Sequence, residues 1–279
     1  MHKHHCRIHF SVQYYQGIPP SLIISALNLL NIEGVELTHA IFDEIDNLVP
    51  RLCKMSSGFH LPLLHENGWD FTCSDSQDKI DRTIRLINRY KDDLNMKYAV
   101  FHPPEVTTHY KEQKQLFRIL LKNVKKIDLP LCIENIPSLS IEAFEDQYEE
   151  AKILLQNRLS GVCFDAPHFY IQGNDPIEMY HRLKDNIKVI HLSDCTRDRD
   201  CHLPFDKIGQ LPVEDILKTL QKEKFAGYIT LEIKPESLQD MGAYIKSYLK
   251  TLRRCNRIKY LKTLFLLFYL RPIMKKFSS

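Results

Sequence analysis

The chain has 279 residues, of which 44% are hydrophobic and 26% are charged, and this balance excludes both a disordered chain and a protein embedded in the membrane. Its formal charge of +3 is unevenly distributed. Residues 250–279 contain nine of the 38 Lys and Arg and no Asp or Glu, which leaves 29 basic and 35 acidic side chains in residues 1–249, a net charge of −6. A mildly acidic body argues against a surface that binds nucleic acid and suits a pocket that collects metal cations.

Short apolar runs rich in β-branched residues alternate along the chain with longer amphipathic stretches, the pattern of βα units. The predicted strands, in chain order, are Ile8–Tyr14, Gly34–Thr38, Gly58–Leu63, Tyr98–His102, Leu131–Ile136, Gly161–Asp165, Ile187–Ser193 and Gly227–Ile233. The predicted helices are Ser21–Leu30, Phe42–Met55, Ser76–Leu94, Tyr110–Lys126, Ile141–Leu159, Pro176–Asp185, Val213–Lys222 and Leu238–Leu252. Eight strands alternating with eight helices predict an α/β fold, a single (β/α)8 TIM barrel. The alternative, an open doubly wound sheet, lacks the glycine-rich motif that would follow its first strand.

The barrel is expected to occupy residues 1–252, followed by a basic and partly apolar C-terminal extension at 253–279. Its uninterrupted apolar run, Thr263–Leu270, is far shorter than the roughly 20 residues that span a bilayer. We expect a last helix that packs on the barrel or on a partner subunit. Peripheral contact with an anionic membrane and contact with nucleic acid are the alternatives.

Eight cysteines lie far apart, without a CxxC pair, and no apolar signal peptide precedes them. This spacing favours free thiols in a reducing compartment and predicts a cytoplasmic location. Cys132 and Cys163 fall inside apolar runs and are expected to be buried thiols.

Polar side chains close six successive predicted strands. They are His60, His102, Glu134, Asp165, His191 and Glu232. Because the carboxyl ends of barrel strands surround one mouth, these side chains should converge there. Clustered carboxylates repel one another unless a divalent cation lies among them. Imidazole and carboxylate without thiolate favour Zn²⁺, Mn²⁺, Co²⁺ or Fe²⁺ over Ca²⁺.

Further donors lie near two of these strand ends. His168 follows Asp165 by three residues, and Asp200 and His202 lie in the long segment after the seventh strand. A solvated loop is the alternative interpretation of Asp200 and His202. Cys195 and Cys201 flank this loop and are alternative metal ligands, but the carboxylates explain a metal site without them.

These residues resemble the xylose isomerase-like barrel superfamily over roughly Ile8–Leu252. In its epimerase branch, the resemblance implies one ion held by Glu134, Asp165, His191 and Glu232, and it implies that His168 and Arg197 contact the substrate. Where that branch has a substrate-binding Glu six residues after Glu134, this chain has Ser140. In the metal-dependent apurinic-site endonuclease branch, the resemblance implies up to three zinc ions, with His60, His102, His168, Asp200 and His202 as further ligands.

The function expected from this pattern is isomerisation or epimerisation of a small sugar or sugar phosphate, with one ion as cofactor. Glu134 and Glu232 would transfer the proton on opposite faces of the substrate. The alternative is a zinc-dependent phosphodiester hydrolase. A third hypothesis, a non-catalytic binding barrel, does not explain why six successive strands end in possible metal ligands. Glu36 is expected to face the mouth, where it would contact substrate or pair with Lys234. Trp69 and Phe71 would form an apolar wall or simply pack.

Overall fold

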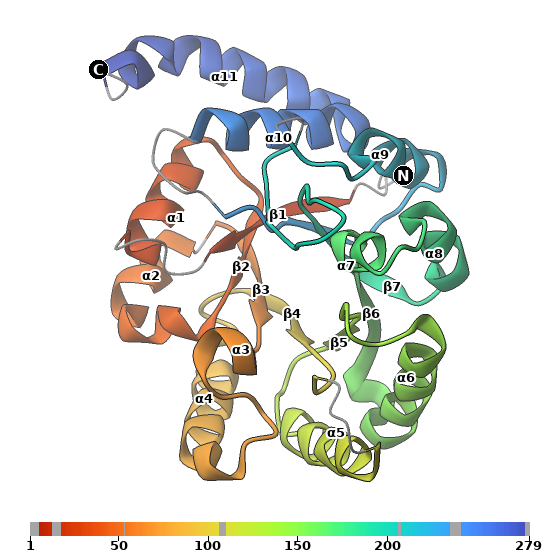
Figure 1. Ribbon diagram of the computed structural model, residues 1–279. Helices are drawn as coiled ribbons and strands as arrows, with labels where there is room; N and C mark the ends of the chain where they lie inside the picture. The colour runs from red at the N-terminus through yellow and green to blue at the C-terminus, as the bar shows by residue number, and fades with distance from the viewer. Residues whose placement is uncertain are drawn as a thin grey trace.

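A computed structural model describes residues 6–12, 18–52, 54–105, 110–205, 208–234 and 241–276, with the side chains of 110, 111, 241 and 270–276 left aside. Its strands are β1 Arg7–Val12, β2 Gly34–Leu37, β3 Ser56–His60, β4 Met96–Phe101, β5 Leu131–Glu134, β6 Leu159–Asp165, β7 Ile187–Leu192 and β8 Tyr228–Leu231. They pair in parallel in the order β1 to β8, and β8 pairs with β1. The predicted TIM barrel is therefore confirmed (Figure 1).

The helices follow the strands in the expected alternation. They are α1 Pro20–Leu29, α2 Ile45–Leu52, α3 Leu64–Asn67, α4 Gln77–Tyr90, α5 Tyr110–Val124, α6 Ile141–Leu155, α7 Ala166–Ile171, α8 Pro176–Leu183, α9 Val213–Lys222, α10 Met241–Cys255 and α11 Arg257–Lys276. Short 3-10 turns lie at His39–Asp43, Ser74–Ser76 and Gln156–Arg158. Two of these helices, α3 and α7, were not predicted, whereas α11 is the last helix expected in the C-terminal extension. The end of the first predicted strand and the start of the last predicted helix lie outside the described residues.

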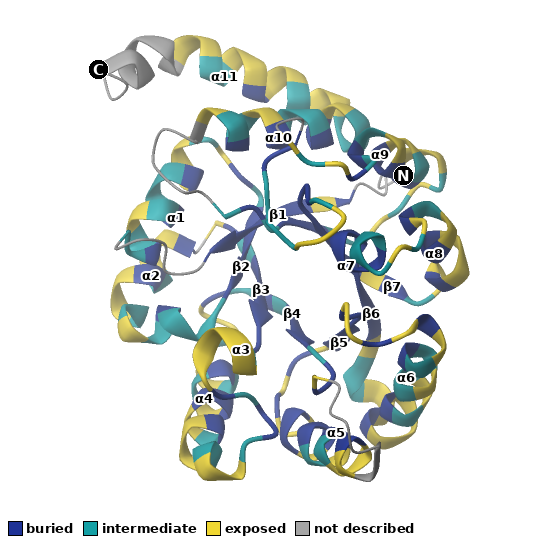
Figure 2. Ribbon diagram, viewed as in Figure 1, coloured by how far each residue is buried: buried dark blue, intermediate teal, exposed yellow. Residues whose placement is uncertain are grey.

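The core has two parts. The larger part fills the layer between the strands and the surrounding helices. The smaller part lies within the closed sheet and contains Tyr98, Val100, Cys132, Cys163 and Val189. Both cysteines are fully buried, as expected. Figure 2 shows the strands as the buried centre of the molecule and the helices as half-exposed.

A glycine allows an aromatic ring to fill the barrel interior. A Cβ at Gly58 on β3 would lie 2.3 Å from Cζ of Tyr98 on β4, closer than two such carbons can approach. The Tyr98 ring therefore occupies the space that a side chain at position 58 would need, and its hydroxyl lies within hydrogen-bond distance of Glu36 and Thr230.

Trp69 and Phe71, which follow β3, are both buried. Trp69 packs against His39 and Phe71, and Phe71 also lines the cavity described below. The pair is therefore mainly packing, and only Phe71 serves as an apolar wall.

Candidate metal centre

The closed barrel brings together the six side chains that end its strands. His60, Glu134 and Asp165 are the last residues of β3, β5 and β6, and His191 is the fifth of six residues in β7. His102 and Glu232 directly follow β4 and β8.

One group of four surrounds a common point. The ligand atoms of Glu134, Asp165, His191 and Glu232 all lie within 4.8 Å of one another. His191 Nδ1 is 3.3 Å from Glu134 Oε1 and 3.0 Å from Glu232 Oε2. These four donors can hold a single divalent ion.

A second group shares the Glu134 carboxylate. His102 Nε2 lies 3.0 Å and His60 Nε2 lies 3.4 Å from Glu134 Oε2, while the other oxygen of Glu134 faces His191. His60 is oriented by its other nitrogen, because Nδ1 donates to the Leu61 carbonyl at 2.9 Å. Glu134 therefore stands between two clusters, in the position of a bridging ligand.

The remaining predicted donors form a third set at the rim. The Nε2 atoms of His168 and His202 each lie 3.3 Å from Asp200 Oδ2. His168 Nδ1 donates to the Asn135 carbonyl at 2.7 Å, which leaves Nε2 as the nitrogen available to an ion or a substrate oxygen.

The loop that carries Asp200 and His202 is anchored rather than freely solvated. Asp194 and Leu203 exchange two backbone hydrogen bonds of 2.8 Å, and Asp194 Oδ1 accepts from the amides of Cys195 and Leu211. The Asp200 side chain is only 22% exposed. Asp200 and His202 are therefore half-buried, although residues 197–199 of the same loop are exposed.

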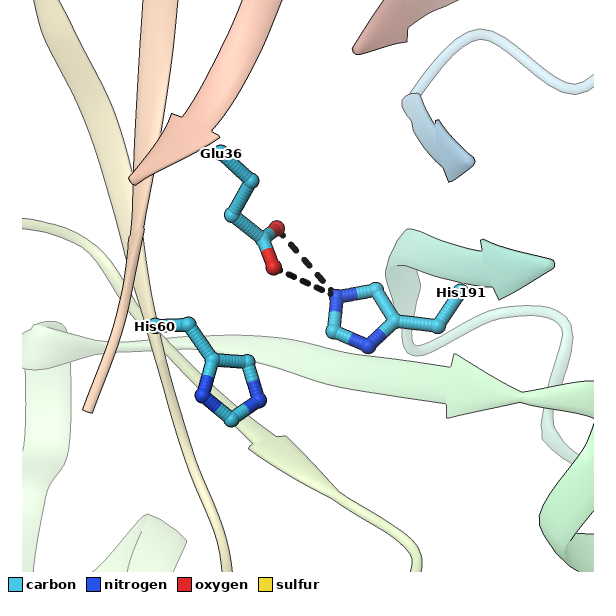
Figure 3. Close-up of side chains that lie close together, drawn as sticks. All are labelled: Glu36, His60 and His191. Atoms are coloured by element: carbon cyan, nitrogen blue, oxygen red, sulfur yellow. Dashed lines mark hydrogen bonds and ion pairs between the residues drawn. The ribbon is translucent and has the colours of Figure 1, made fainter. Parts of the chain in front are cut away.

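Glu36 on β2 faces His191 on β7 (Figure 3). Its side chain is 1% exposed, and His191 Nε2 lies 3.0 Å from Oε1 and 3.2 Å from Oε2. Tyr98 and Thr230 donate their hydroxyls to Glu36 Oε2 at 2.9 and 3.0 Å. If Nε2 of His191 carries the proton that Glu36 accepts, the lone pair of Nδ1 points into the four-residue group. Metal-binding histidines usually have a carboxylate or carbonyl that accepts from the nitrogen facing away from the ion, as Glu36 would here.

The expected pairing of Glu36 with Lys234 is wrong. Lys234 Nζ lies 2.7 Å from Glu66 Oε1 on α3, at the barrel surface.

Arg197 stacks on Tyr170, with its Cζ 4.1 Å from the ring centroid, and donates to the Tyr170 carbonyl. Ser140 caps α6 by accepting from the Ala143 amide, which gives this departure from the family pattern a structural role.

Several buried donor atoms at the centre have no hydrogen-bond partner within the described residues. They are His102 Nε2, Glu134 Oε2 and His191 Nδ1. They lie at ion-pair distance from their neighbours but without hydrogen-bond geometry, and a buried polar atom that makes no hydrogen bond is costly. A cation among these atoms removes that cost, so the donor set fits a divalent metal ion.

The pKa shifts of Glu134 and Asp165 also fit a site for a divalent metal ion. Burial alone would raise the pKa of Glu134, but the His102 and His191 imidazoles outweigh burial and hold that pKa well below its ordinary value. Burial raises the pKa of Asp165 well above its usual range, and the neighbouring Glu134 adds to the effect against the influence of His168. Asp165 therefore becomes a good ligand only when positive charge is supplied nearby.

A cavity of about 350 Å³ opens beside the centre. Its polar lining includes His102, His168 and Asp200 from the predicted set, together with Asp70 and Glu105. Its apolar lining is Leu61, Pro62, Leu63, Leu64, Phe71, Phe101, Pro103, Leu120, Ile136 and Pro137. The volume suits a small molecule.

Sequence reasoning missed three supporting residues. Asn135 accepts from the Asp165 amide and donates to the Asp165 carbonyl, at 2.8 and 2.9 Å, so it fixes the end of β6. Tyr98 and Thr230 hold Glu36. Thr230 lies two residues before Glu232, so the two-residue alternation of a strand could have placed it on the inner face.

Solved structures with the same fold carry several activities. The chain is 13% identical to an AP endonuclease of family 2 from Brucella melitensis, with 87% of this chain and 99% of that chain covered and a TM-score of 0.67. It is 13% identical to a 3-keto-D-glucoside 4-epimerase from E. coli, with 88% and 98% covered and a TM-score of 0.65. It is 11% identical to a D-allulose 3-epimerase from a Methylomonas species, solved with D-allulose, with 86% and 90% covered and a TM-score of 0.56. At these identities the likeness shows a shared fold.

None of the curated proteins matches the chain. The xylose isomerase-like TIM barrel family model matches residues 24–255, which include the whole strand-end cluster. The chain therefore belongs to the xylose isomerase-like TIM barrel family.

Proposed function

We propose that the protein is a divalent-metal-dependent isomerase or epimerase of a small, uncharged sugar or sugar derivative. The observation that carries this proposal is the position of two carboxylates, Glu134 and Glu232, on either side of His191 Nδ1, at 3.3 and 3.0 Å. Mn²⁺, Co²⁺ or Zn²⁺ held by Glu134, Asp165, His191 and Glu232 would polarise the substrate oxygens and lower the pKa of the adjacent C–H.

Both glutamates have the protonation state that abstraction of a proton from the substrate requires. Burial would raise the pKa of Glu232, but His191 outweighs burial and lowers it, as His191 and His102 do for Glu134. Both side chains are therefore carboxylates at neutral pH. One can take the proton from the substrate carbon, and the other, after it has gained a proton from solvent, can return that proton on the opposite face.

Other residues would orient the substrate. His168 lines the cavity and offers Nε2 to a substrate oxygen, because its Nδ1 is held by Asn135. A contact between Arg197 and the substrate requires Arg197 to leave its stack on Tyr170. Glu36 would act through His191, as a positioning residue, because its oxygens already accept from Tyr98, Thr230 and His191.

The charge of the cavity favours an uncharged substrate over a sugar phosphate. Its described lining contains the carboxylates of Asp70, Glu105 and Asp200 and no Lys or Arg, and two of its three imidazoles, His65 and His168, already pair with Glu105 and Asp200. A phosphate group in this cavity would meet negative charge without the guanidinium or ammonium group that usually binds it.

A zinc-dependent phosphodiester hydrolase is the second candidate, and one observation favours it. Glu134 lies between the four-residue group and the His60 and His102 pair, as a ligand shared by two ions would. The third set at Asp200 could hold another ion. The acidic lining and the net charge of −6 in residues 1–249 oppose binding of a nucleic acid backbone.

The test is exchange of substrate hydrogen with solvent deuterium. Protein loaded separately with Mn²⁺, Co²⁺ or Zn²⁺ is incubated with a panel of ketoses, aldoses and their phosphates in D₂O, and C–H exchange is followed by NMR. We expect exchange with an unphosphorylated sugar, loss of exchange in Glu134→Gln, and full exchange in the matched control Glu150→Gln, which lies on α6 and pairs with Arg118. Cleavage of an abasic oligonucleotide by protein holding three zinc ions, with no exchange on any sugar, would overturn the proposal.

A cytoplasmic location also remains a proposal. It is supported by the free thiols of the seven described cysteines, which are typical of a reducing compartment.

A further inference from the structure

The outward face of α11 is almost entirely apolar. The exposed side chains are Ile258 at 59%, Leu261 at 64%, Leu264 at 38%, Phe265 at 64%, Phe268 at 70% and Tyr269 at 63%. At 100° per residue these six positions fall in one continuous stripe along the helix. Figure 2 shows this outer side of α11 as exposed over much of its described length. A contiguous apolar surface of this kind marks an interaction site.

The opposite face of α11 is fixed to the rest of the protein. Thr263 is buried, Tyr260 packs against the core, and Lys259 pairs with Glu33 at 2.9 Å. Figure 1 shows α11 running alongside α10, outside the ring of helices that surrounds the barrel. The apolar stripe is therefore held facing away from the barrel.

The surroundings of the stripe are positively charged. Arg257 and Lys262 are exposed on the same helix, and Lys262 borders the stripe. On α10, Lys250, Arg253 and Arg254 all approach the single carboxylate of Glu214, so cations outnumber anions there. Residues 250–279 contain nine Lys and Arg and no acidic residue.

We propose that α11 docks on the surface of an anionic lipid bilayer, with its apolar stripe in the interface and its basic residues at the headgroups. A second copy of the chain is the less favourable occupant, because two such faces would bring like charges together. Anionic lipid supplies the opposite charge and also accepts Phe and Tyr at its interface. Within the described residues no helix has the length and apolarity to cross a bilayer, so α11 lies along the surface. The more acidic barrel then faces the solvent.

The test is co-sedimentation of the full-length protein with vesicles. We expect binding to phosphatidylcholine vesicles that contain phosphatidylglycerol, weak binding to phosphatidylcholine alone, and release by salt. Leu261→Gln with Phe265→Gln should abolish binding. The matched control is Leu29→Gln with Ile153→Gln, which removes two equally exposed apolar side chains from α1 and α6 and should bind normally.

A charge variant separates the lipid from other partners. Arg257→Gln with Lys262→Gln should weaken binding to the anionic vesicles about 30-fold, the loss expected for two basic side chains at such a surface. Thermal unfolding of each variant checks that the fold is retained. Equal binding to both kinds of vesicle, no binding to either, or a dimer in solution that Leu261→Gln with Phe265→Gln converts to a monomer would overturn the proposal.

Discussion

The Glu36→Gln substitution tests how the barrel interior supports the metal centre. Gln has nearly the same shape as Glu, and its amide can donate to Tyr98 or Thr230 while its oxygen accepts from His191. The fold should therefore survive. The substitution removes the negative charge of the Glu36 carboxylate, which lies 3.0 Å from His191 Nε2 on a side chain that is only 1% exposed. A hydrogen bond to a charged group contributes about 1.5–3 kcal/mol, so metal affinity should fall about 10- to 100-fold.

The assay is competition for Zn²⁺ or Co²⁺ against a chelating indicator, which reports affinity independently of activity. Glu33→Gln is the matched control. Glu33 lies just before the same strand, and it pairs with Lys259 on α11 rather than with His191. This variant should bind metal like the wild type. A Glu36→Gln protein whose affinity stays within about twofold of the wild type would refute the role given to Glu36.

Two further predictions concern the barrel below the centre. Gly58→Ala should lower the free energy of unfolding by about 1–3 kcal/mol in urea titrations, because the new Cβ meets the Tyr98 ring, and Tyr98→Leu in the same chain should restore part of the loss. An unchanged urea midpoint would contradict this close packing. Burial lowers the pKa of His9 to about 3, against 6.5 in the unfolded chain, so its neutral form contributes stability that is complete above pH 6.5 and is lost as pH falls toward 3. Between pH 6.5 and 4, metal-free wild type should lose about 1.4 kcal/mol per pH unit more than His9→Gln, and parallel urea curves for the two proteins would contradict the prediction.

The fold, and the meeting of the candidate ligands at one mouth, could be predicted because both follow from the repeated alternation of strands and helices along the chain. Eight apolar runs alternating with eight amphipathic stretches leave few architectures, and a closed parallel barrel brings the carboxyl ends of its strands to one mouth. A Glu or His at the end of a buried strand, such as Glu134 or His102, must then lie at that mouth.

The arrangement within the mouth could not be predicted. Which atoms face each other depends on the register of neighbouring strands, and the register shifts between Ser57 and Gly58 and between Val162 and Cys163. The position of Glu134 between two clusters is a result of that register. The pairing of Glu36 with His191 joins β2 to β7 across the barrel, a contact that spacing along the chain does not encode.

The C-terminal extension was predicted in composition but not in geometry. Its basic and apolar residues were evident, yet which of them face outward depends on how α11 packs. The buried Thr263 and the ion pair of Lys259 set that orientation, and both depend on tertiary contacts.

The most direct test is anomalous diffraction from crystals of the protein grown with Mn²⁺, Co²⁺ or Zn²⁺. The account predicts an ion bonded to Glu134, Asp165, His191 and Glu232, at about 2.0–2.2 Å from their oxygen and nitrogen atoms. Crystals that bind the metal only at other positions, with those four side chains turned away from one another, would contradict it.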